Sequence, residues 1–182
     1  MIMYKAVIFD LDGTLVDSLD SIWYVLTLTL KHFGLPAVTH AQVKSYIGNG
    51  ARELVRLAIG EENADRLDEI LTYYKKEYAA DDNSCVKLFK GEKGLLKKLK
   101  AQGVKIAIFT NKPQAATLNT VEKFFEKFGL DCVQGQEDGL PLKPSPEGVY
   151  KIIEKLGVNG KDCLFVGDGE TDVETAKNAG MD

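Results

Sequence analysis

Short apolar runs alternate with longer amphipathic stretches over most of this chain. The strand-like runs lie at 6–9, 104–109, 131–133 and 163–166. The stretches with helical periodicity that accompany them lie at 92–101, 113–128, 146–156 and 171–179. Strands that are mostly apolar and separated by helices are typical of parallel sheets buried on both faces. The pattern therefore predicts an α/β fold, a Rossmann-like parallel sheet with right-handed crossovers and helices on both faces.

One long segment interrupts this alternation. Residues 17–82 contain four helical patterns, at 17–33, 39–48, 51–59 and 67–78. Asp17 is the expected N-cap of the first, and Thr39 with Gln42 forms a capping box at the second. We therefore expect a catalytic core made of 1–16 and 83–182, with an inserted four-helix cap at 17–82.

Length and charge narrow the classes of function. The 182 residues suffice for one domain with a modest insertion. A net charge of −4 without a basic cluster argues against a nucleic-acid binder, and no apolar run is long enough for a membrane span. The stretch Met1 to Lys5 leads straight into the first strand, which indicates no signal peptide. The sequence does not define an oligomeric state.

The three cysteines indicate a reducing compartment. Cys85, Cys132 and Cys163 are odd in number, far apart and in or beside apolar segments. This pattern favours free core thiols over a disulfide framework or a zinc site. We expect a cytoplasmic protein.

The first strand ends on two aspartates with candidate chemistry. Asp10 and Asp12 follow the run 6–9 and are followed by Gly13, which permits a sharp turn. In extended chain, side chains at this spacing point the same way, and paired carboxylates repel unless a cation lies between them. All-oxygen ligands favour Mg²⁺ over zinc. Taken alone, the pair also fits a loop with solvated acids.

Later strand ends carry further candidates. Thr110 and Asn111 precede a predicted helix start, where free N–H groups bind anions, although such a segment also serves as a plain helix cap. Lys143 precedes two prolines, Pro144 and Pro146, which stiffen the backbone and fix its direction; a solvated loop lysine is the alternative. Asp168 and Asp172 follow the last strand and fit a cation site. Alternatively, the acids cap helix 171–179, for which Asp168 and Glu170 suffice.

Together, these residues resemble the motifs of haloacid dehalogenase-like hydrolases, in their phosphoglycolate-phosphatase-type form. The run Asp10 to Ser18 resembles the first motif, and Thr110, Lys143 and the pair Asp168 and Asp172 resemble the other three. The resemblance spans nearly the whole chain. It departs from the family pattern at Lys90, where proline is usual, and at Gly169, where serine is common.

The resemblance implies a Mg²⁺-dependent phosphatase acting on a small phosphate monoester through a phosphoaspartyl intermediate. Asp10 would be the nucleophile and Asp12 the general acid and base. The resemblance implies that Mg²⁺ is held by Asp10, the backbone carbonyl of Asp12, and Asp168, with Asp172 holding a metal-bound water or orienting Lys143. The expected phosphate ligands are Thr110, Asn111 and Lys143.

The part of the substrate that does not carry the phosphate would be bound by the cap. The loop Gly48, Asn49, Gly50 with Arg52 is the candidate, since glycines allow close approach and Arg binds carboxylates; a plain helix–helix turn is the alternative. A carboxylated ester such as 2-phosphoglycolate is then the leading substrate. A phosphomutase of the same fold, similar to beta-phosphoglucomutase, and a non-catalytic binding protein remain as other functions.

The last expectation concerns residue 182. In the family that the sequence resembles, another strand follows the Ala179-Gly180 turn, whereas only Met181 and Asp182 remain here. We therefore expect a truncated form in which the strand 163–166 is a sheet edge with unpaired backbone groups.

Overall fold

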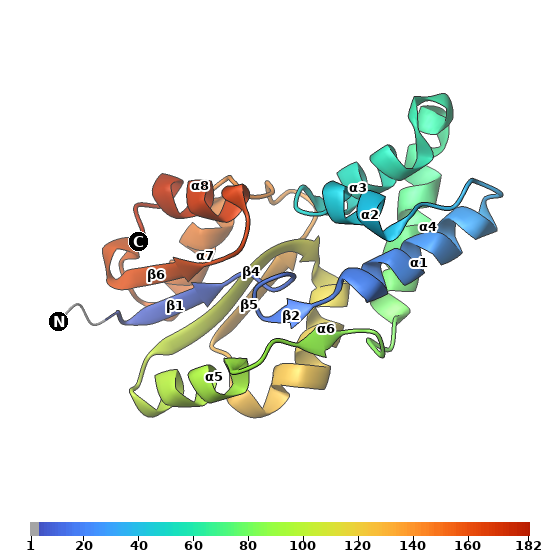
Figure 1. The fold of residues 1–182 in the computed structure, drawn as a ribbon. Helices are drawn as coiled ribbons and strands as arrows, with labels where there is room; N and C mark the ends of the chain where they lie inside the picture. The colour runs from blue at the N-terminus through green and yellow to red at the C-terminus, as the bar shows by residue number, and fades with distance from the viewer. Residues whose placement is uncertain (1–3) are drawn as a thin grey trace.

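A four-stranded parallel sheet forms the centre of the molecule. The computed structural model describes residues 4–182, and its strands follow the spatial order β5-β4-β1-β6 (Figure 1). The strands are β1 (Ala6–Phe9), β4 (Lys105–Pro113), β5 (Cys132–Gln136) and β6 (Cys163–Val166). Because β1 pairs in parallel with both β4 and β6, Asp10 follows an interior strand. The predicted α/β fold is confirmed.

Helices cover both faces of this sheet (Figure 1). The side chains of β1 alternate between two hydrophobic clusters. Ala6 and Ile8 pack with residues of α7 and α8, while Val7 and Phe9 pack with residues of α5 and α6. The four helices are α5 (Glu92–Ala101), α6 (Gln114–Phe125), α7 (Glu147–Leu156) and α8 (Glu170–Asn178). This two-faced burial explains the continuously apolar sequence of the strand.

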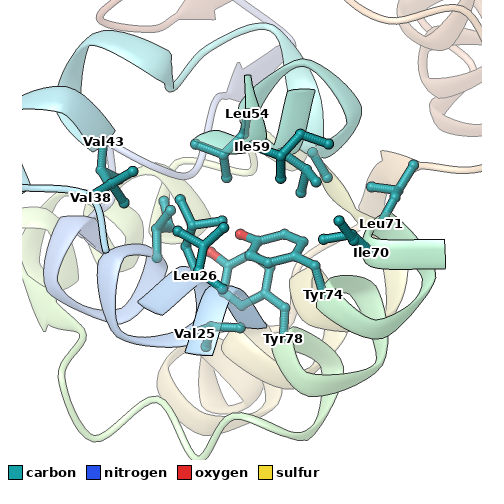
Figure 2. Close-up of a cluster of buried hydrophobic side chains, with 14 of the residues drawn as sticks. Val25, Leu26, Val38, Val43, Leu54, Ile59, Ile70, Leu71, Tyr74 and Tyr78 are labelled. Atoms are coloured by element: carbon teal, nitrogen blue, oxygen red, sulfur yellow. The ribbon is translucent and has the colours of Figure 1, made fainter. Parts of the chain in front are cut away.

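The helices between β1 and the rest of the sheet form a separate layer beside its carboxyl ends, which we call the helical cap. Its helices are α1 (Leu19–His32), α2 (His40–Tyr46), α3 (Gly50–Ile59) and α4 (Leu67–Ala80). Their apolar side chains point toward one another around the rings of Tyr74 and Tyr78 (Figure 2). Ala116 of α6 belongs to the same cluster, so the helical cap is packed against the core. The two connections to the core are joined where Ser21 Oγ donates to Asp81 Oδ2 at 2.7 Å.

Local structure confirms some predicted helix ends and corrects others. The capping box at Thr39 is present, with Thr39 N donating to Gln42 Oε1 at 2.9 Å. Asp17 was the wrong N-cap: the position belongs to Ser18, without a side-chain capping bond. Asp17 instead lies in β2 (Val16–Asp17), which pairs antiparallel with β3 (Lys87–Leu88). This small sheet was not predicted, because two-residue strands have no recognisable periodicity.

The remaining elements are short. Three 3-10 helices complete the described structure, namely η1 (Glu61–Arg66), η2 (Glu126–Phe128) and η3 (Gly160–Asp162). Strand β4 continues through Pro113, beyond its predicted end at Phe109, and the helix expected from Pro113 begins at Gln114. This extension places the polar residues Thr110, Asn111 and Lys112 on a strand end.

Three further observations concern the edge strand β6, the cysteines and the lengths of the helices. Strand β6 is at the sheet edge, as expected. Its backbone groups are not all unpaired, however, because Phe165 N donates to Asp182 O at 2.8 Å. All three cysteines are free thiols, and Cys132 and Cys163 are buried. Within residues 4–182, no helix has both the length and the apolar character needed to cross a membrane.

Candidate active site

A cavity of about 520 Å³ lies where the carboxyl ends of the strands face the helical cap. Its lining contains the predicted residues Asp10, Asp12, Thr110, Asn111, Lys143, Asp168 and Asp172. These residues come from four different segments of the chain. Parallel strands place their carboxyl ends at one edge of the sheet, which is where open α/β folds bind ligands. The structure therefore brings together all the predicted core site residues.

Asp10 is a buried carboxylate held by a buried lysine. Its side chain is 7% exposed, and its Oδ1 accepts a hydrogen bond from Lys143 Nζ at 2.7 Å. Burial raises the pKa of Asp10 to about 6, in opposition to the positive charge of Lys143. For Lys143, burial lowers the pKa, but Asp10 and Asp172 outweigh it and the net shift is upward. Lys143 is therefore a cation fixed against Asp10.

Asp172 orients that lysine. Lys143 Nζ donates to Asp172 Oδ1 at 2.6 Å, and Gly169 N donates to Asp172 Oδ2 at 3.0 Å. Both carboxylate oxygens of Asp172 thus have partners. This is the lysine-orienting alternative of the two roles expected for Asp172.

Three carboxylates converge beside Asp10. One oxygen from each of Asp10, Asp168 and Asp172 lies within 4.8 Å of the others. Asp168 is exposed to solvent and its Oδ1 accepts a hydrogen bond from Thr14 Oγ1 at 3.2 Å. An all-oxygen donor set with excess negative charge fits a hard divalent cation such as Mg²⁺. The carboxylate of Asp12 is outside this group, so Asp12 would contribute through its backbone carbonyl, as the resemblance implies.

Gly13 is required for this convergence. It has a φ of +90°, and a Cβ at this position would lie 2.4 Å from Asp168 Oδ2. Any other residue would be strained there and would displace the carboxylate. The glycine of the first motif thus makes room for the aspartate of the last.

Asn111 forms a different set of contacts from those expected of a phosphate ligand. Its Oδ1 accepts a hydrogen bond from Lys143 N at 2.8 Å. Its Nδ2 donates to Gly48 O of the helical cap at 2.9 Å and to Lys143 O at 3.3 Å. The side-chain amide is therefore committed to protein groups. Thr110, 3% exposed, lines the cavity and accepts a hydrogen bond from Lys112 N at 3.3 Å.

Lys112 was not among the predicted site residues, although it lies in the predicted anion-binding segment. Its side chain is 1% exposed, and its Nζ is 3.0 Å from Asp12 Oδ1. The same ammonium donates to Tyr78 Oη of α4 and lies 4.3 Å from the centroid of that ring. Burial raises the pKa of Tyr78 well above its usual range, so the phenol is neutral. Sequence proximity to Thr110 was the available signal, but only the fold shows that Lys112 turns inward.

The predicted cap residues do not share one position. Gly48 and Gly50 line the cavity, whereas Asn49 and Arg52 are outside its lining. Arg52 is exposed and its Nη1 is paired with Asp68 Oδ1 of α4 at 2.6 Å. Arg52 is on α3, and in this conformation the helix turns its side chain toward α4 rather than toward the cavity. Lys44 is instead the one cationic side chain that the described part of the helical cap contributes to the lining.

A family model for haloacid dehalogenase-like hydrolases matches residues 7–182. Asp10 follows an interior strand, pairs with Lys143 and lies in the carboxylate cluster. The chain belongs to the haloacid dehalogenase-like hydrolase family. It is an enzyme of the hydrolase class.

Relatives of this chain within the family include proteins named phosphoglycolate phosphatase. The phosphoglycolate phosphatase of Yersinia pseudotuberculosis is 36% identical over 99% of this chain and 81% of the relative. The phosphoglycolate phosphatase of Rhodospirillum rubrum is 35% identical over 98% of this chain and 78% of the relative. A candidate phosphoglycolate phosphatase from Lactobacillus delbrueckii subsp. bulgaricus has a crystal structure that superimposes with a TM-score of 0.87. It is 28% identical, and the match covers 99% of this chain and 84% of that one.

Proposed function

We propose that this protein is a Mg²⁺-dependent phosphatase that hydrolyses a small phosphate monoester, with 2-phosphoglycolate as the leading substrate. The observation that carries the proposal is the buried Asp10 carboxylate, held by Lys143 at 2.7 Å beside a cluster of three carboxylates. The relatives named phosphoglycolate phosphatase support the choice of substrate.

Asp10 is the proposed nucleophile. Its carboxylate oxygen attacks phosphorus, the phosphorus–oxygen ester bond breaks, and an acyl phosphate forms on Asp10. Lys143 lies against Asp10 and is positioned to bind the transferring phosphoryl oxygens together with Thr110. Such fixed positive charge stabilises the transition state. Asp172 keeps the lysine in place.

Asp12 is the proposed general acid and base. It protonates the leaving alkoxide in the first step. In the second step it takes a proton from the water that attacks the acyl phosphate, which releases inorganic phosphate and the free Asp10 carboxylate. Asp12 lines the same cavity as Asp10, and its side chain is 14% exposed, which leaves it accessible to a bound substrate.

The metal site would be formed by Asp10, Asp168 and the backbone carbonyl of Asp12. When bound there, Mg²⁺ supplies positive charge that offsets the repulsion between the carboxylates and the phosphate.

The pKa of Asp10 predicts how Mg²⁺ changes stability with pH. Because the folded-state pKa, about 6, is above the ordinary value of 3.8, protonation of Asp10 stabilises the fold below pH 3.8. This stabilisation is lost as the pH rises through about 6. A cation at Asp10 replaces the proton, so we expect Mg²⁺ to raise the thermal unfolding midpoint more at about pH 7.5 than at about pH 5. Asp10→Asn is the control and should lose most of this difference, whereas equal shifts at both pH values in the parent would contradict the assignment.

A substrate screen tests the proposed function. Initial rates would be measured with 2-phosphoglycolate, p-nitrophenyl phosphate and a sugar phosphate, with Mg²⁺ and with a chelator. We expect Mg²⁺-dependent release of inorganic phosphate, fastest from 2-phosphoglycolate. Turnover of a sugar phosphate that requires a bisphosphorylated sugar would identify a phosphomutase instead. Binding of phosphate esters without turnover of any of them would identify a non-catalytic protein.

Lys44 and Arg52 offer a matched comparison for the carboxylate end of the substrate. Only Lys44 lines the cavity in this structure, whereas Arg52 pairs with Asp68. We expect Lys44→Met to raise KM for 2-phosphoglycolate by about tenfold and to leave KM for p-nitrophenyl phosphate unchanged, because only the first carries a carboxylate. Arg52→Met is the comparison and should have little effect on either substrate. A larger rise in KM for 2-phosphoglycolate in Arg52→Met than in Lys44→Met would assign the carboxylate contact to Arg52.

A further inference from the structure

Two adjacent residues of β4 each join a catalytic group to the helical cap. Asn111 joins Gly48, just before α3, to Lys143, since its Nδ2 donates to Gly48 O at 2.9 Å while its Oδ1 accepts from Lys143 N at 2.8 Å. The side chain of Asn111 is buried. The position of Lys143, and with it the contact to Asp10, is therefore tied to the loop that begins α3.

Lys112 makes the equivalent connection for the acid and base. Its Nζ lies between Asp12 Oδ1, at 3.0 Å, and Tyr78 Oη of α4. Both Lys112 and Tyr78 are buried, so water does not compete for the ammonium. Because Lys112 contacts one oxygen of Asp12, it fixes the direction of the carboxylate.

The same surfaces of the helical cap and core fit closely around these contacts. Gly50 has a φ of +83°, and a Cβ there would lie 2.9 Å from Leu142 Cδ1 and 3.7 Å from Asn111 O. The start of α3 therefore lies close against the core, and an alanine at position 50 would be strained by its positive φ and would displace the Leu142 side chain. On the other side, Asn119 Nδ2 donates to Asp81 O at 2.6 Å, where α4 ends.

We propose that Asn111 and Lys112 are positioning residues that make the alignment of Lys143 and Asp12 depend on docking of the helical cap. This inference rests on the proposed phosphatase mechanism. The site becomes fully aligned when Gly48 and Tyr78 are seated against the core, so that phosphoryl transfer takes place in a closed cavity. The Asn111 amide already bonds to Gly48 and Lys143. The Lys112 ammonium already bonds to Asp12 Oδ1 and Tyr78 Oη, so both side chains have protein partners in place of a phosphate.

Lys112→Met tests the connection to Asp12. A p-nitrophenolate leaving group needs no proton, whereas an aliphatic alkoxide does. We therefore expect the first-turnover burst from p-nitrophenyl phosphate to stay within about threefold of the parent, while steady-state turnover falls by about 10²-fold because hydrolysis of the acyl phosphate lacks an aligned base. With 2-phosphoglycolate, both the first turnover and the steady state should fall. Tyr78→Phe should affect the same phases as Lys112→Met, but each affected rate should fall by only about threefold.

Lys76→Met is the matched control, because Lys76 is exposed on the same helix as Tyr78. It should leave both phases unchanged. If Lys112→Met instead abolishes the burst, or raises KM equally for both substrates, Lys112 is a phosphate ligand and the proposal fails for this residue. If the parent itself does not hydrolyse phosphate esters, it is the proposed function that fails. If Lys112→Met does not fold, the Tyr78→Phe burst decides the question.

A double-mutant cycle tests the connection through Asn111. We expect Asn111→Ala and Gly50→Ala each to lower kcat for 2-phosphoglycolate by about tenfold, since each prevents the same docking. The double variant should be no slower than the slower single variant. Effects that multiply to about 10²-fold would show that the two residues act independently, and would overturn the proposal.

Discussion

Asp10→Asn is expected to lower kcat by at least about 10⁴-fold, because it removes the nucleophile while keeping its shape. Asp10 directly follows an interior strand and is buried, so its carboxylate is held in one position. Steady-state release of inorganic phosphate from p-nitrophenyl phosphate is the appropriate measurement.

The fold of this variant should persist. The lysine that loses the Asp10 charge keeps its bond to Asp172 Oδ1 at 2.6 Å. A cooperative thermal transition and an unchanged far-UV spectrum would show that loss of activity is chemical. A well-folded variant with activity within about tenfold of the parent would exclude Asp10 as the nucleophile.

Asp12→Asn should stop the reaction at a later point. The first step with p-nitrophenyl phosphate proceeds without a general acid, but hydrolysis of the acyl phosphate loses its base. We expect steady-state turnover to fall by about 10³-fold and labelled protein to accumulate to a large fraction of the enzyme, as measured by rapid quench with radiolabelled substrate.

Two outcomes would exclude Asp12 as the base that hydrolyses the acyl phosphate. The parent is the control and should show a smaller labelled fraction under the same conditions, because its acyl phosphate is hydrolysed with the base in place. Equal rates in parent and variant, or a slow variant with no labelled protein, would remove Asp12 from the hydrolytic step.

The core of the site could be predicted from the sequence because strand ends of a parallel sheet meet at one edge. Asp10 and Thr110 directly follow apolar runs, and Asp168 comes one residue later after another. Their proximity follows from the topology of the sheet. The lysine of the loop, Lys143, was placed by resemblance to a family motif, and its contact with Asp10 agrees with that placement.

The contacts between the helical cap and the core could not be predicted in this way. They depend on how two separately packed layers dock, which no periodicity encodes. The pairing of Arg52 with Asp68 and the inward turn of Lys112 toward Tyr78 follow from that docking. Asn111 was expected to bind phosphate, because its sequence context gives no sign that its side-chain amide bonds to Gly48 and Lys143.

The most direct test of the central claim is to locate the phosphoryl group on the enzyme. The parent and the Asp12→Asn variant would be mixed with radiolabelled substrate and Mg²⁺, quenched in acid and digested, and the labelled peptide would be sequenced. The account predicts an acid-stable, base-labile acyl phosphate on Asp10 that forms only with Mg²⁺ present. Label on any other residue, or full turnover by the parent with no labelled peptide in either protein, would contradict it.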